Sequence, residues 1–160
     1  LCDRRQRQMC IRDSFVPLTD LLAKYLRPEP EDMKDPEFRA ISTRLTLYTA
    51  AVAISQVANH DKSGIFSTGL IPDGDIAMNV NGDIGVTLRV RNHHMVTIKD
   101  RCDKPRAAMT FGSLEIAGQL LRGEVSAMGC ICDGSIAMSG MVNMIDNVNR
   151  ILDRVSIYLA

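Results

Sequence analysis

Thiols are the groups in this chain best suited to redox, nucleophilic or zinc chemistry. Beyond the first residues, Cys130 and Cys132 stand two residues apart and Cys102 stands alone. On an extended segment the paired thiols would share one side, and on a helix they would point roughly 200° apart. Neither arrangement is the C-x-x-C of redox sites. We interpret these cysteines as small buried hydrophobic residues, with redox or zinc chemistry as the alternative.

Two further groups could in principle bind a metal ion. His93 and His94 are adjacent, so in a strand they would point to opposite faces, and no third ligand stands at a suitable spacing. Asp73, Asp75 and Asp83 resemble a calcium loop only in their acidity, because the regular alternation and the final Glu are missing. We interpret both groups as turn residues and predict no metal site, no cofactor and no catalytic residue.

Methionine is abundant in the part of the chain expected to fold, whereas tryptophan is absent. Unbranched thioether side chains can adapt their shape around an apolar ligand, so a site lined by them would not demand one ligand geometry. Ordinary core filling is the alternative. The methionines concerned are Met78, Met95, Met109, Met128, Met138, Met141 and Met144.

The C-terminal third predicts the elements that would position many of these residues. Met109 and Phe111 alternate with smaller residues, which predicts a strand over residues 107–111. Ser113 can cap a helix that Gly123 would end. After an irregular stretch, alternation within residues 134–140 predicts a second strand. A long amphipathic helix follows, with an apolar stripe made by Met141, Met144, Ile145, Val148, Ile151, Leu152, Val155, Tyr158 and Leu159.

The central part of the chain predicts a sheet that begins near Gly64. Two alternating runs over residues 76–80 and 84–90 are joined by Asn81-Gly82, a strong hairpin signal. Asn92-His93 offers the next turn before a third strand over residues 95–99. These strands are expected to be antiparallel neighbours.

A long helix is predicted before this sheet. Asp35 can cap it, Pro36 suits its first position, and apolar residues recur at helical spacing to about residue 59. Its apolar stripe is broad, so we expect the helix to pack between the sheet and a second surface, such as a partner subunit.

The glycine spacing and apolar positions of the C-terminal third resemble the sterol carrier protein type-2 domain family. The family pattern is a TITM-like strand, a helix ending LLxGK, and a GKLKIEG-like strand, and it falls on residues 107–111, 120–124 and 134–140. Glu124 and Met141 depart from it, so contacts made by those family side chains are not carried over. The resemblance implies an α+β fold, in which an antiparallel or mixed sheet of about five strands is covered on one face by helices and encloses an apolar cavity.

The resemblance also implies that the chain binds, and could transfer, a lipid such as a sterol, a fatty acyl chain or an isoprenoid or quinone intermediate. Two alternatives stay open. One is an accessory or oligomerisation domain with a vestigial lipid site, and the other is a small thiol-dependent enzyme using Cys130, Cys132 or His94. The residues expected to line the cavity are Met109, Phe111, Leu114, Leu120, Leu121, Met128, Ile131, Ile136, Met138, Met144, Ile145 and Val148.

Composition narrows the function classes. The 19 basic and 19 acidic residues balance. The chain therefore lacks the excess positive charge typical of nucleic-acid-binding proteins. No stretch reaches the ~18 apolar residues of a membrane span, so we expect no stable membrane insertion. The odd count of 5 cysteines argues against a closed disulfide framework and indicates a reducing compartment, the cytoplasm.

Three segments are expected. Residues 1–14 carry a basic cluster without an apolar period and resemble translated adapter sequence, so we expect a non-native or disordered tail. Residues 15–34 would form a short helix and a proline-rich linker. Residues 35–160 would form the lipid-binding domain, with a homodimer contact through the helix over residues 36–59.

Overall fold

The computed structural model describes residues 15–159, and the expectation for the tail at 1–14 lies outside the described residues. Internal contacts divide the chain into two units, Leu1–Leu45 and Thr46–Ala160, which are described separately. The predicted domain boundary at residues 34 and 35 stays a prediction. Within the residues described, no helix combines the length and apolar character needed to cross a bilayer.

The first unit contains a helix over residues 15–26, as predicted, a short 3₁₀ helix and the start of the long helix α2 (Pro36–His60). The Asp35 carboxylate accepts a hydrogen bond from the N–H of Glu37 at 3.0 Å, which confirms the predicted cap. The ring of Tyr25 stacks on that of Phe38 with centroids 4.6 Å apart. This contact joins the first helix of the unit to α2.

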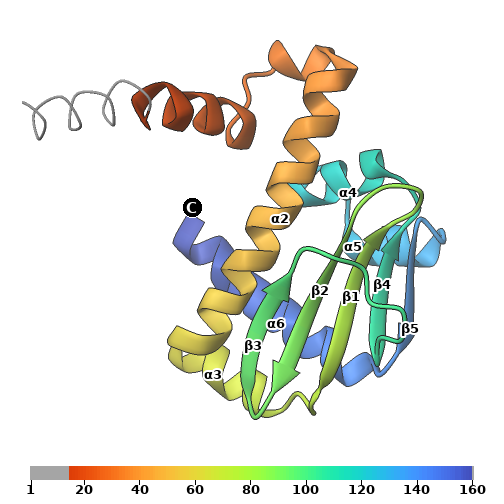
Figure 1. Ribbon diagram of the computed structural model, residues 1–160. Helices are drawn as coiled ribbons and strands as arrows, with labels where there is room; N and C mark the ends of the chain where they lie inside the picture. Colours follow the sequence, from red (N-terminus) through yellow and green to blue (C-terminus); the bar gives the residue numbers. More distant parts are fainter. Residues whose placement is uncertain (1–14, 160) are drawn as a thin grey trace, which may run out of the picture. The chain divides into compact units, whose positions relative to one another are not determined.

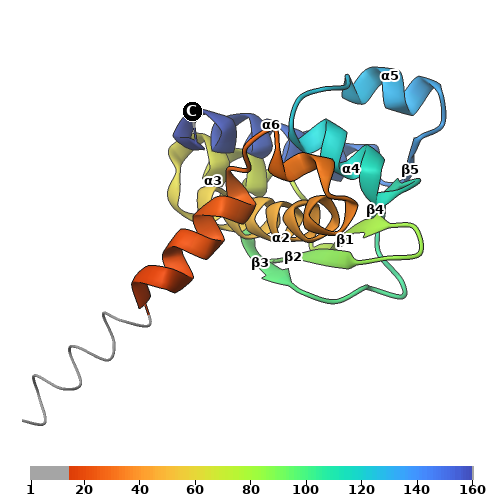
Figure 2. The same cartoon turned by 90° about the horizontal axis from the view of Figure 1, so that it is seen from above.

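The second unit contains a five-stranded mixed sheet with helices on one face, which confirms the predicted α+β class and sheet, whereas the enclosed apolar cavity stays a prediction (Figures 1 and 2). The strand order is β3-β2-β1-β4-β5, and every neighbouring pair is antiparallel except β1 with β4. Strands β1 and β4 are parallel, so the chain crosses the uncovered face of the sheet between β3 and β4 (Figure 1). The strands are β1 (Gly74–Val80), β2 (Gly85–Arg91), β3 (His94–Ile98), β4 (Ala107–Phe111) and β5 (Ile136–Gly140).

Both predicted hairpin turns are present. The turn between β1 and β2 contains Asn81 and Gly82, and Gly82 has a φ of 73°. In the turn between β2 and β3, Asn92 and His93 have φ values of 50° and 60°. Positive φ at both central residues is the type I′ geometry, whose twist matches that of the flanking strands.

The sheet begins at Gly74, so the prediction of a start near Gly64 was wrong. Helix α3 (Lys62–Gly69) occupies that segment instead. The Asp61 carboxylate starts α3 by accepting hydrogen bonds from the N–H groups of Ser63 and Gly64, at 2.9 and 3.0 Å. A Cβ at Gly64 would lie 2.0 Å from the carbonyl oxygen of Val57 in α2, so glycine permits the close approach.

The C-terminal third contains one helix more than predicted. Helix α4 (Leu114–Leu121) has the predicted caps, since Ser113 Oγ accepts from the N–H of Ile116 at 3.3 Å and Gly123 has a φ of 72°. The stretch predicted to be irregular contains α5 (Ala127–Cys132), which has no side-chain cap. Helix α6 (Val142–Leu159) follows β5. The core lies between the sheet and α2, α4 and α6.

Helix α2 supplies much of this core from its second half. Leu47, Ala51, Ile54 and Ala58 are fully buried, so the broad apolar stripe seen in the sequence is largely used within the unit. Thr97 Oγ1 donates to the carbonyl oxygen of Ala51 at 2.8 Å, which ties β3 to α2. The helix therefore has less apolar surface left for a partner than its sequence indicates.

Candidate functional site

The predicted lining residues of β4 and β5 lie on the helix-covered face of the sheet. Met109 of β4 lies directly opposite Met138 of β5, and Phe111 lies opposite Ile136. Met109 also neighbours Met78 of β1, so three methionines form one row across adjacent strands. This row places flexible thioethers side by side, as an adaptable apolar surface requires.

Helices bring the other predicted residues to the same region. Helix α6 packs against β4, α4 also contacts β4, and α5 contacts β5. Five predicted lining residues are buried: Phe111, Ile136, Met144, Ile145 and Val148. Five more are partly buried against the same core: Met109, Leu114, Leu120, Leu121 and Ile131.

The remaining two lie at the surface. Met128 of α5 is 69% exposed and Met138 is 37% exposed. Met141 and Val142, at the junction of β5 and α6, are exposed as well. These four residues, from neighbouring or consecutive elements, form what we call the β5 rim. Apolar side chains left open to solvent beside an apolar core are what a site for an apolar ligand would present.

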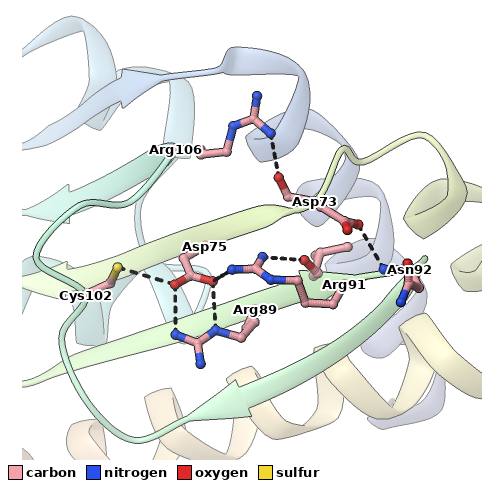
Figure 3. A network of polar contacts seen from close by, with 8 residues as sticks. Asp73, Asp75, Arg89, Arg91, Asn92, Cys102 and Arg106 are labelled. Carbon is pink, nitrogen blue, oxygen red and sulfur yellow. Dashed lines mark hydrogen bonds and ion pairs between the residues drawn. The ribbon is translucent and has the colours of Figure 1, made fainter.

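Charged side chains occupy the uncovered face of the sheet (Figure 3). The Asp75 carboxylate accepts two hydrogen bonds from Arg89, both at 2.9 Å. It also forms a longer ion pair with Arg91, at 3.4 Å. The Arg89 guanidinium, through its hydrogen bonds, holds the pKa of the Asp75 carboxyl below its usual range. Asp75 was therefore wrongly interpreted as a turn residue. Asp73 does serve a turn, because it accepts from the N–H of Asn92 at 2.9 Å.

Cys130 and Cys132 lie far from His94, the histidine that could have acted as their base. Cys130 is buried and Cys132 exposed, both in α5 beside β5, whereas His94 lies on β3 at the opposite edge of the sheet. Cys102 lies over the uncovered face, with its Sγ 3.6 Å from Asp75 Oδ2. Over the residues described, no three His, Cys, Asp or Glu side chains are grouped to hold a metal ion. The geometry thus gives the α5 thiols no histidine base from β3.

Arg106, which directly precedes β4, was not among the residues expected at the site. Its guanidinium donates from Nη1 to the main-chain oxygen of Asp73, as Figure 3 shows. Its aliphatic part passes over Gly74, where a Cβ would lie 2.4 Å from Arg106 Cδ and 3.2 Å from Met144 Cε. A glycine at the start of a strand, which leaves room for another side chain, is the one sequence signal of this arrangement.

Neither a protein-family model nor a curated protein matches this sequence. Similar solved structures do exist. A structure titled UbiJ-SCP2 ubiquinone synthesis protein is 8% identical, with a TM-score of 0.52 over 70% of this chain and 96% of its own. Sterol carrier protein domain 2 of Helicoverpa armigera is 13% identical, with a TM-score of 0.53 over 69% of this chain and 87% of its own.

Sterol carrier protein 2 from Yarrowia lipolytica, in its apo form, is 15% identical, with a TM-score of 0.50 over 68% of this chain and 88% of its own. At such identities the likeness concerns the fold. It agrees with the α+β fold and its five-stranded mixed sheet. The chain therefore contains a domain with the sterol carrier protein 2 fold.

Proposed function

We propose that this chain binds an apolar lipid ligand between α6 and the helix-covered face of β4 and β5. The observation that carries the proposal is the apolar row of β1, β4 and β5, which ends at the exposed β5 rim. The similar structures support it through their titles, which name sterol carrier proteins and a ubiquinone synthesis protein. A sterol, an acyl chain or an isoprenoid or quinone intermediate fits this chemistry.

The lining of the site follows from the same geometry. The ten core residues named above would surround the ligand, and Met128 and Met138 would close over its open side. A ligand that buries about 200 Å² of apolar surface would gain about 5 kcal/mol. Binding and transfer of this kind require no catalytic group. The free Cys102, Cys130 and Cys132 favour a reducing compartment such as the cytoplasm.

Native mass spectrometry of the purified chain, followed by lipid extraction, tests this function. We expect a bound species that is released by organic solvent, and saturable uptake of an added fluorescent lipid by the delipidated chain. A chain that carries nothing after purification and takes up no fluorescent sterol, fatty acid or quinone analogue would contradict the proposal. A stable oligomer without lipid would instead favour the accessory-domain alternative.

The homodimer contact through the helix over residues 36–59 is a separate proposal. Val52, on the α2 face away from the core, is 41% exposed and would lie in such an interface. Val52→Glu should then convert a dimer to a monomer, because a buried unpaired carboxylate is costly. Light scattering during size-exclusion chromatography measures the mass. A wild-type chain that is monomeric at high concentration would rule this contact out.

A further inference from the structure

Arg106 is held at one end of the layer between the sheet and α6. Its main-chain N–H donates to the carbonyl oxygen of Asp75 at 2.8 Å, and its own carbonyl oxygen accepts from the N–H of Met141 at 2.9 Å. The residue is thus fixed between β1 and the first residues that lead into α6. A Cβ at Gly140 would lie 2.1 Å from the Arg106 carbonyl oxygen, so the chain also packs closely here.

The side chain of Arg106 lies on the helix-covered side of the sheet. Gly74 is two residues before the buried Ile76 and pairs with the buried Val90, so its missing side chain would point toward the helices. The Arg106 stem occupies that space, next to the terminal methyl of Met144. The guanidinium therefore lies where the apolar layer under α6 reaches solvent.

Arg106 differs from several other arginines of the second unit in having no ion-pair partner among the described residues. Arg89 and Arg91 pair with Asp75, and Arg154 pairs with Asp61. Within residues 15–158, the Arg106 guanidinium makes no ion pair and one hydrogen bond, to a main-chain oxygen. A guanidinium has five N–H donors, so most of those of Arg106 are available to an added acceptor.

We infer that Arg106 binds the acidic headgroup, a carboxylate or a phosphate, of an amphipathic ligand whose apolar chain occupies the proposed site. This inference rests on the proposed function. Met141 of the β5 rim donates its N–H to the Arg106 carbonyl oxygen, so the main chain of Arg106 adjoins the rim while its side chain extends over Gly74 toward Asp73. A guanidinium binds a carboxylate or a phosphate through paired, charge-assisted hydrogen bonds. A neutral headgroup would not compensate the charge of the guanidinium, which would stay hydrated.

The test compares three ligands with the same twelve-carbon chain: dodecanoate, dodecyl phosphate and dodecanol. Isothermal titration of the full chain should show that both anions bind more tightly than the alcohol. Arg106→Met keeps an apolar stem beside Met144 and removes the charge, so it should weaken binding of both anions roughly tenfold or more and leave dodecanol unchanged. Arg106→Lys, which keeps the charge without the planar fork, should fall between.

Lys104→Met is the matched control, because Lys104 is an exposed cation of the same connection. It should leave the preference for anions unchanged. Equal wild-type affinity for the alcohol and the anions would overturn the headgroup role while leaving the apolar site intact. So would an equal loss for all three ligands in Arg106→Met, or a loss in Lys104→Met as large as that in Arg106→Met. No binding of any of the three would count against the proposed function itself.

Discussion

At the scale of single residues, Met138 tests the apolar site most directly. It lies on the helix-covered face of an edge strand and is partly exposed. Met138→Lys should therefore remove most binding of an uncharged ligand, because the ammonium would have to be desolvated beside it. The fold should tolerate the change, since lysine at an exposed position usually costs less than about 0.5 kcal/mol. Titration with dodecanol and a thermal melt measure the two effects.

Val96→Lys provides the control for this variant. Val96 is 48% exposed on β3, at the opposite edge of the sheet. It should bind dodecanol as the wild type does and melt at a similar temperature. If both lysine variants bind normally, the ligand does not lie over β5, and the site assigned to β4 and β5 is wrong.

A substitution at Gly74 offers a second test at this scale, because it would displace the Arg106 side chain without removing its charge. An alanine there would place a methyl group 2.4 Å from Arg106 Cδ, so the flexible arginine would have to move. Gly74→Ala should reduce the preference for dodecanoate over dodecanol, although no charge is lost. Titration of both ligands gives the ratio. An unchanged ratio would mean that the arginine is not required in its present place.

Single residues also show where sequence reasoning about the site ends. Met128 and Met138 were expected to line an apolar cavity, yet both are exposed, because exposure depends on the edge position of β5 and on α5. Arg106 gave no signal of its own, since its place depends on the pairing of β4 with β1. Residue type indicated which side chains suit a lipid, and tertiary pairing decided which of them face solvent.

At the scale of elements, Asp61 joins α3 to α6. Its carboxylate accepts from Tyr158 Oη at 2.7 Å and from Arg154 Nη2 at 3.3 Å, besides capping α3. The Tyr158 hydrogen bond, followed by those from Gly64 and Arg154, lowers the pKa of Asp61 from 3.8 to about 2. The ionised carboxylate thus binds its partners only in the folded protein.

This shift predicts the acid dependence of stability. Because the folded-state pKa lies below the unfolded one, the contribution of Asp61 is complete above pH ~4 and is lost as the pH falls toward ~2. Asp61→Asn should therefore melt below the wild type at pH 7, and the gap should narrow between pH 4 and 2. Thermal melts across this range measure it. A gap that stays constant with pH would show that the carboxylate charge is not responsible.

The elements differ in how much their own sequence determines them. Local spacing correctly predicted the helix caps Ser113 and Asp35 and the turn Asn92-His93, because these features involve only residues a few positions apart in the sequence. Helix α3 depends on Gly64 fitting against the Val57 carbonyl of α2, and α5 has only six residues and no side-chain cap. Such elements are stabilised by neighbours that local periodicity does not identify.

At the scale of the whole molecule, the parallel pairing of β4 with β1 determines what the fold can do. It places β5 and β3 at opposite edges, which separates the β5 rim from His94. The class of fold could be predicted from the alternating runs and the glycine spacing. The strand order could not, because β1 and β4 are joined only through two other strands and a crossing connection.

Ligand binding should stabilise the unit that contains the proposed site, Thr46–Ala160. A ligand that binds only the folded state at 100 times its Kd adds about 2.7 kcal/mol, which for a chain of 160 residues raises the melting midpoint by roughly 5–10 °C. Melts with increasing dodecanol should show this rise in the wild type and in Val96→Lys, and little of it in Met138→Lys. If the melting midpoint of the wild type stays constant while titration reports saturable binding, the ligand does not bind preferentially to the folded state, and it does not occupy the proposed site.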